Sequence, residues 1–195
     1  MRNVLDQIER ALEANLYYLA LFVSLAIPDI CGALGSDDGC ATGAKYTKWF
    51  DEHVVPQFLD TMRRLLSEAL PGPVAKSLND ELGGLPSDAP MLTGEICYRF
   101  RCSLLHQGRA RFPNMPFSRV LFVEPGKSTS VMHMCQSEDA LIIDLRLFCR
   151  EVVRAAQEWL DQVEGTEQFE RNYAEFARVH PDGLSPYIGG VPVVG

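Results

Sequence analysis

The chain has 195 residues, of which 47% are hydrophobic and 23% are charged, a composition that fits one globular domain with a well-buried core. Its net charge of −8 argues against broad nonspecific adhesion to nucleic acid or to an anionic membrane. The longest apolar run, residues 16–27, is shorter than a bilayer span and follows an acidic amphipathic stretch unlike a secretory leader. We therefore expect a cytoplasmic protein with reduced thiols and no membrane partner.

The first predicted element is a long helix over residues 2–27. Apolar residues recur there at steps of three and four, and Pro28 is expected to stop the helix. Because the second half is apolar nearly all round, this helix should be the most buried one. The peptide 28–32 that follows is predicted to form a tight corner. There, Asp29 satisfies local backbone donors or, in an alternative interpretation, orients Arg101 from a neighbouring element.

The rest of the chain is predicted to be helical with one interruption. The pattern predicts helices over 45–70, with a kink or division at Pro56, and over 93–109, 138–163 and 166–179. Two strands, 119–124 and 130–135, are expected to pair as a small inserted hairpin, at about 119–135. The fold class is therefore mainly α: an up-down bundle of four to five helices spanning 1–180. The proline- and glycine-rich residues 181–195 are predicted to be a loosely ordered tail.

Positive charge is concentrated in one part of this acidic chain. Residues 94–123 contain five arginines and one acid, giving a local charge of +4 and leaving −12 on the remainder. Such a basic patch fits a focused site for an anion, although a chance cluster of solvated arginines gives the same pattern. The five arginines are Arg99, Arg101, Arg109, Arg111 and Arg119.

Arg101 and His106 are the residues in this patch that suggest chemistry. A guanidinium holds a phosphate, and an imidazole moves a proton near neutral pH. On an ideal helix the two residues lie about 140° apart. A joint role therefore requires the helix to end near Gly108, or a second copy of the chain to supply the matching groups.

An arginine followed after four residues by a histidine, late on a helix of a mainly helical protein, resembles the motif of the HEPN superfamily (higher eukaryotes and prokaryotes nucleotide-binding domains). The resemblance implies a helical bundle that usually forms a homodimer. It also implies an endoribonuclease of the toxin or defence type that needs no metal or cofactor. RNA and an antitoxin or regulatory protein would be its partners. Other members are inactive or bind nucleotides, so a non-catalytic interaction or nucleotide-binding module is the alternative.

By position, the resemblance implies that Arg101 stabilises the scissile phosphate and that His106 transfers a proton as the 2′-hydroxyl attacks. The position after the arginine is often asparagine, aspartate or histidine in active members and is Cys102 here. The helical wheel places Arg99, Cys102 and Arg109 nearest to His106, and with Arg111 they are the expected substrate-binding residues.

Three other interpretations stay open at this point. His106 could cap a helix end while Arg101 faces solvent, with no chemistry at all. A thiol nucleophile is conceivable because Cys102 and His106 are four residues apart, but no orienting Asn or Asp is identifiable. Zinc binding is disfavoured because the candidate ligands contain no CxxC pair. These candidates are Cys97, Cys102, His106, His133 and Cys135.

Overall fold

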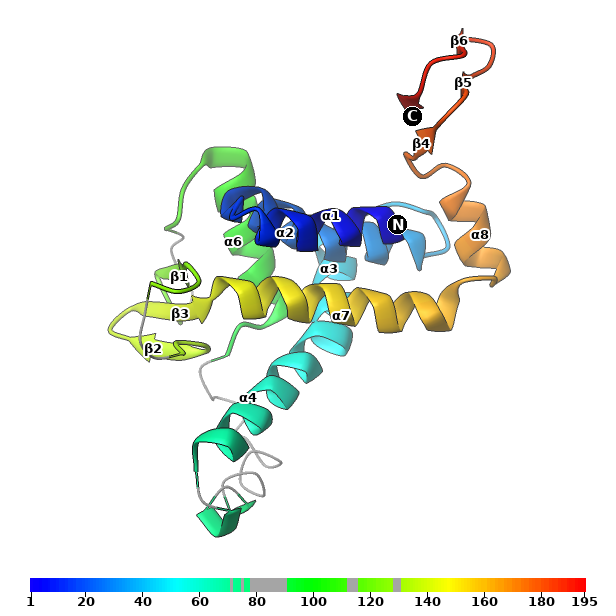
Figure 1. Cartoon of the computed structure of the whole chain (residues 1–195). Helices are drawn as coiled ribbons and strands as arrows, with labels where there is room; N and C mark the ends of the chain where they lie inside the picture. The colour runs from blue at the N-terminus through cyan, green and yellow to red at the C-terminus, as the bar shows by residue number, and fades with distance from the viewer. Residues whose placement is uncertain (71, 75, 78–90, 112–115, 128–130) are drawn as a thin grey trace.

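The fold is described from a computed structural model, which covers residues 1–70, 72–74, 76–77, 91–111, 116–127 and 131–195. This part of the chain is mainly helical, as predicted, with a small three-stranded sheet (Figure 1). The helices are α1 (Arg2–Glu13), α2 (Tyr17–Leu34), α3 (Gly43–Trp49), the π-helix η1 (Phe50–Val54), α4 (Val55–Ala69), α6 (Gly94–Gln107), α7 (Leu145–Val163) and α8 (Glu167–Tyr173). Residues 128–130 of the expected hairpin lie outside the described residues.

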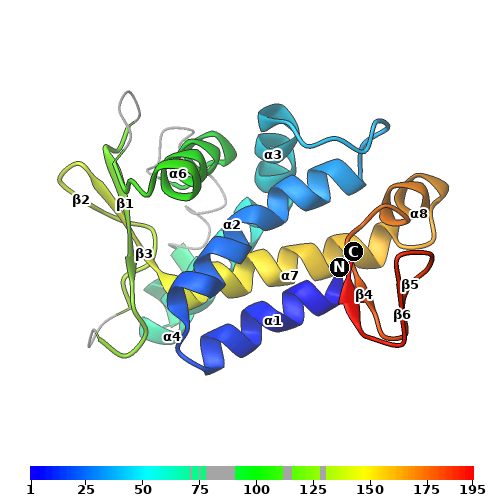
Figure 2. The same ribbon diagram turned by 90° about the horizontal axis from the view of Figure 1, so that it is seen from above.

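The single N-terminal helix that the sequence predicted is in fact two helices, α1 and α2. The chain breaks at Asn15, which has a φ of 57°. Asparagine tolerates this left-handed conformation better than most residues do, and its side-chain oxygen accepts a hydrogen bond of 2.7 Å from the Tyr17 hydroxyl. The break turns the chain so that α1 and α2 pack against each other and against α7 (Figure 2).

The predicted corner at residues 28–32 is also wrong, because these residues lie inside α2. Pro28 cannot donate to the Ser24 carbonyl, so the helix loses one internal hydrogen bond there. Burial of the surrounding apolar residues, including Leu25, Ile27 and Cys31, offsets this loss. By length and hydropathy α2 could cross a membrane, but half of its residues are buried inside the protein, as in a core helix.

The segment 45–70, which was predicted to kink or divide at Pro56, is not divided there. The helix does not stop, but its hydrogen bonding changes to the π pattern in η1 immediately before α4. Pro56 has no N–H to donate to the Glu52 carbonyl, which explains why the regular α pattern cannot continue through this turn.

The predicted hairpin is replaced by a different sheet. Strand β1 (Arg119–Val123) pairs in parallel with β3 (Ala140–Asp144), and β2 (Cys135–Ser137) pairs with β3 on its other side in antiparallel orientation. Residues 140–144 were expected to begin a helix. Their apolar, partly β-branched side chains suit a strand equally well, and the Asp144 side chain caps the following helix by accepting a 2.9 Å hydrogen bond from the Leu147 amide.

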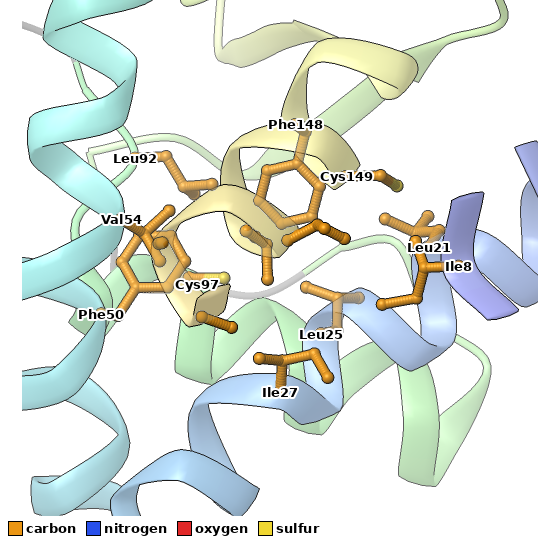
Figure 3. Close-up of a cluster of buried hydrophobic side chains, with 14 of the residues drawn as sticks. Ile8, Leu21, Leu25, Ile27, Phe50, Val54, Leu92, Cys97, Phe148 and Cys149 are labelled. Atoms are coloured by element: carbon orange, nitrogen blue, oxygen red, sulfur yellow. The ribbon is translucent and has the colours of Figure 1, made fainter. Parts of the chain in front are cut away.

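The core lies where α1, α2, η1, α6 and α7 meet (Figure 3). Its labelled side chains are Ile8, Leu21, Leu25, Ile27, Phe50, Val54, Leu92, Cys97, Phe148 and Cys149. The sheet lies at the N-terminal end of α7 and α8 at its C-terminal end, as both views of the ribbon show. Thr166 caps α8, as predicted, although α8 ends at Tyr173 rather than near residue 179.

The last residues form two short antiparallel strand pairs. Strand β4 (Val179–His180) pairs with β7 (Val193–Val194), and β5 (Gly183–Leu184) pairs with β6 (Ile188–Gly189). These pairs are outside the helical core. That the tail is loosely ordered, and that 1–180 is a single domain, remain predictions.

Candidate functional site

The helix that carries the candidate site, α6, has Thr93 as its N-cap, as predicted, and ends at Gln107, two residues before the predicted end. The Thr93 hydroxyl accepts a hydrogen bond of 3.4 Å from the Ile96 amide at the N-terminus. Gly108 ends the helix in the left-handed conformation, with a φ of 63°. Gly94 lets α6 approach α3 closely, because a Cβ atom there would lie 2.4 Å from the Thr47 carbonyl oxygen. The site is thus fixed by the docking of α6 on α3 and by the helix end.

Arg101 is anchored by a carboxylate from another helix. Asp29 of α2 forms an ion pair with Arg101 through its Oδ2 atom and Nη2 of the guanidinium, and both side chains are mostly buried. The alternative in which Asp29 orients Arg101 is therefore what the geometry provides, and the local backbone role is wrong. The carboxylate fixes the direction of the guanidinium, as bidentate and charge-assisted pairs usually do.

Arg101 also contacts His106 within the same chain. Nη1 of Arg101 lies 3.0 Å from Nε2 of His106, whose side chain is exposed. The guanidinium keeps its protons, so it is the donor and Nε2 the acceptor, which places the imidazole proton on Nδ1. The end of the helix near Gly108 accompanies this contact, as predicted, and the long arginine side chain spans the angular separation without help from a second subunit.

The charges of the site influence one another. Burial raises the pKa of the Asp29 carboxyl above its usual range, while Arg101 and His106 act in the opposite direction. Burial lowers the pKa of the Arg101 guanidinium, but Asp29 and Cys102 outweigh it, so the net change is upward. Arg101 is therefore a permanent cation whose charge is largely balanced by Asp29 in the free protein.

Two more side chains of α6 belong to the same cluster. The Cys102 thiol lies 3.8 Å from Nη1 of Arg101. Cys102 is therefore close to the site, as the helical wheel predicted. Tyr98, one turn earlier, interacts with the Cys102 thiol through its hydroxyl. Tyr98 is a residue that the sequence motif did not include, although it lies three residues before Arg101 and four before Cys102, the spacing of neighbours on one helix face.

The other predicted substrate-binding arginines have different partners. Arg99 is exposed and forms a 2.8 Å ion pair with Glu95. The Arg111 guanidinium lies 3.9 Å from the Asp139 carboxylate. The backbone carbonyl of Arg111 accepts a hydrogen bond from the Ser103 hydroxyl. Arg109 is exposed just beyond the helix end. Within the described residues these three arginines have no hydrogen bond or ion pair with Arg101 or His106, so substrate binding by them stays a prediction.

The candidate zinc ligands occupy separate environments. The Cys97 thiol is buried 3.2 Å from the Tyr46 hydroxyl, whereas His133 is buried 3.2 Å from Glu151. Across the described parts of the chain, no three His, Cys, Asp or Glu side chains are gathered where they could hold a metal ion. Of these candidates, Cys102 and His106 meet at the proposed site, where both contact Nη1 of the Arg101 guanidinium.

Comparisons with known proteins add no assignment to this geometry. No protein-family model matches the chain, and neither the curated proteins nor the solved structures gave a match.

Proposed function

We propose that the protein is a HEPN-like, metal-independent endoribonuclease of the toxin or defence type. The observation that carries the proposal is the Asp29–Arg101–His106 arrangement, in which an anchored guanidinium contacts an exposed imidazole. A cation for the phosphate and a base for the 2′-hydroxyl are the two groups that this reaction requires. We further propose that the helices form an up-down bundle that dimerises in a bacterial-type cytoplasm, with an antitoxin or regulatory protein as a partner.

In the proposed mechanism, substrate binding activates the base. The RNA phosphate accepts hydrogen bonds from Arg101 and so draws Nη1 away from His106. Nε2 of His106 then accepts the proton of the 2′-hydroxyl as its oxygen attacks phosphorus. The bond from phosphorus to the 5′-oxygen breaks, which leaves a 2′,3′-cyclic phosphate. The departing 5′-oxygen takes a proton from water, and His106 returns the proton that it accepted to the solvent.

A non-catalytic interaction or nucleotide-binding module is the second candidate. It is favoured by the net charge of −8 and by Asp29, which already balances the charge of Arg101. RNA affinity normally depends on several cationic phosphate contacts, and this site contributes one mostly buried cation. Such a module would bind without cleaving.

RNA cleavage in EDTA distinguishes the two candidates. The wild-type protein should cleave RNA without divalent metal, leaving cyclic phosphate and 5′-hydroxyl ends. Arg101→Ala and His106→Ala should each reduce the rate at least about 100-fold, because each removes a group that acts in the transition state. An exposed arginine of α4 that pairs with Glu68 provides the control, so Arg64→Ala should stay within about threefold. Cleavage that persists equally in all three variants would contradict the proposal.

A further inference from the structure

Tyr98 lies at the proposed site but has no part in the mechanism above. Its hydroxyl interacts with the Cys102 thiol, and this thiol lies 3.8 Å from Nη1 of Arg101. The side chain is neither fully buried nor fully exposed. The phenol and the guanidinium therefore flank the same sulfur atom on one turn of α6.

The ring of Tyr98 is held by α3. A Cβ atom at Gly43 would lie 2.8 Å from Cε1 and Cζ of the ring and 3.0 Å from its oxygen, so only glycine leaves room for the ring there. The buried Tyr46 ring packs against it at a centroid distance of 5.3 Å. Because Gly43 and Tyr46 restrict the ring on one side, fewer positions are open to the hydroxyl before a ligand binds, which lowers the entropic cost of using it.

The present partner of this hydroxyl is a poor one. A thiol is a weak hydrogen-bond acceptor, whereas a phosphate oxygen is a strong and charged one. The Cys102 thiol also raises the pKa of the Tyr98 hydroxyl, so the phenol keeps its proton at neutral pH and can donate it. An anion beside Arg101 would therefore be the better acceptor for Tyr98.

We infer that Tyr98 is a substrate-binding residue, whose hydroxyl donates a hydrogen bond to the phosphodiester held at Arg101. The inference rests on the proposed function only in placing an RNA phosphate at Arg101. It adds a neutral donor to a site that has one cation, and it assigns a role to Gly43, which keeps that donor in place.

Binding of an RNA that cannot be cleaved tests the inference separately from catalysis. The probe is a fluorescent, mixed-sequence oligonucleotide with 2′-O-methyl groups throughout, measured by anisotropy at low salt. Tyr98→Phe keeps the packed ring and removes the hydroxyl, so the dissociation constant should rise about tenfold, as for one hydrogen bond to a charged group. Gly43→Ala, which displaces the ring, should weaken binding at least as much.

The matched control is Tyr46→Phe. Its hydroxyl is buried against the Leu25 carbonyl and Cys97, so this variant should bind the probe with wild-type affinity. Wild-type affinity in Tyr98→Phe, or in Arg101→Ala, would overturn the inference, as would a wild-type protein that fails to bind the probe. Binding with the expected pattern but no cleavage of ordinary RNA would support the role of Tyr98 and count against the nuclease.

Discussion

At the residue scale, Arg101 is the centre of the candidate site. Its guanidinium contacts a carboxylate on one side and an imidazole on another, and it lies near a thiol. Asp29 has two opposing effects there. Under the proposed function, it would orient the guanidinium for the transition state and would compete with the phosphate for the same hydrogen-bond donors.

Replacing Asp29 by asparagine separates these two effects. Asp29→Asn removes the negative charge at nearly constant size, so RNA should bind about threefold more tightly because Arg101 is no longer neutralised. The turnover number should nevertheless fall about tenfold, because the guanidinium is less firmly oriented. Steady-state cleavage kinetics, with the Michaelis constant and turnover number determined separately, provide the measurement.

Asp60→Asn is the control for the loss of one carboxylate, since its partner Arg63 lies on the exposed surface of α4. This variant should leave both kinetic constants unchanged. A rise in the Michaelis constant of Asp29→Asn with an unchanged turnover number would mean that Asp29 supports binding alone, contrary to the expectation.

The residues of the site were only partly predictable from the sequence. The spacing of Arg101 and His106 and the glycine at 108 gave the motif and its helix end. Asp29 was one of two interpretations, because a sequence pattern does not tell which helix packs beside it. Tyr98 was missed because its place depends on Gly43, a contact between positions 55 residues apart in the chain.

At the element scale, local signals predicted helices well and failed where tertiary contacts decide. Caps at Thr93 and Thr166 and the effect of Pro56 follow from chemistry within one turn. Local chemistry does not explain the helix break at Asn15 or the continuation of α2 through Pro28. At both places, the burial of neighbouring residues decides which conformation prevails. The apolar run 140–144 is ambiguous between strand and helix until β1 pairs with it.

The close approach of α6 and α3 can be tested at one position. Gly94→Ala places a methyl group 2.4 Å from the Thr47 carbonyl oxygen and 2.8 Å from the Thr47 Cα atom, so the two backbones must separate. We expect a loss of about 1–3 kcal/mol in the free energy of unfolding, typical of overpacking. Urea unfolding followed by circular dichroism measures this loss, and RNA cleavage should fall with it because α6 carries the site.

A second glycine serves as the reference for this substitution. Gly189 has open space around the corresponding Cβ position, so Gly189→Ala should leave the free energy of unfolding within about 0.5 kcal/mol of the wild type. If both alanine variants unfold at the wild-type urea concentration, the stability of the protein does not depend on the close contact between Gly94 and Thr47.

At the scale of the whole molecule, burial divides the six cysteines into distinct groups. All six are free thiols. Cys31, Cys97 and Cys149 are buried, Cys102 is half-buried at the site, and Cys40 and Cys135 are exposed.

The buried thiols predict how stability depends on alkaline pH. Burial raises the pKa of Cys97 and of Cys149 to about 12 each, from a usual value near 9. Between these two values the unfolded chain loses thiol protons that the folded protein keeps, so stability falls as pH rises above about 9. At pH 10.5 each thiol should lower the free energy of unfolding by about 2 kcal/mol relative to pH 8. Urea unfolding at the two pH values measures the difference.

A double variant separates the effect of the Cys97 and Cys149 thiols on the pH dependence of stability from the effect of tyrosines and lysines, which titrate in the same range. Cys97→Ala with Cys149→Ala should lower stability at pH 8, because it leaves cavities, but should lose about 4 kcal/mol less than the wild type on going to pH 10.5. Cys40→Ala with Cys135→Ala replaces exposed thiols and should keep the wild-type dependence. If the buried double variant loses as much stability as the wild type between these pH values, the two thiols ionise without unfolding, and the core around them must admit water.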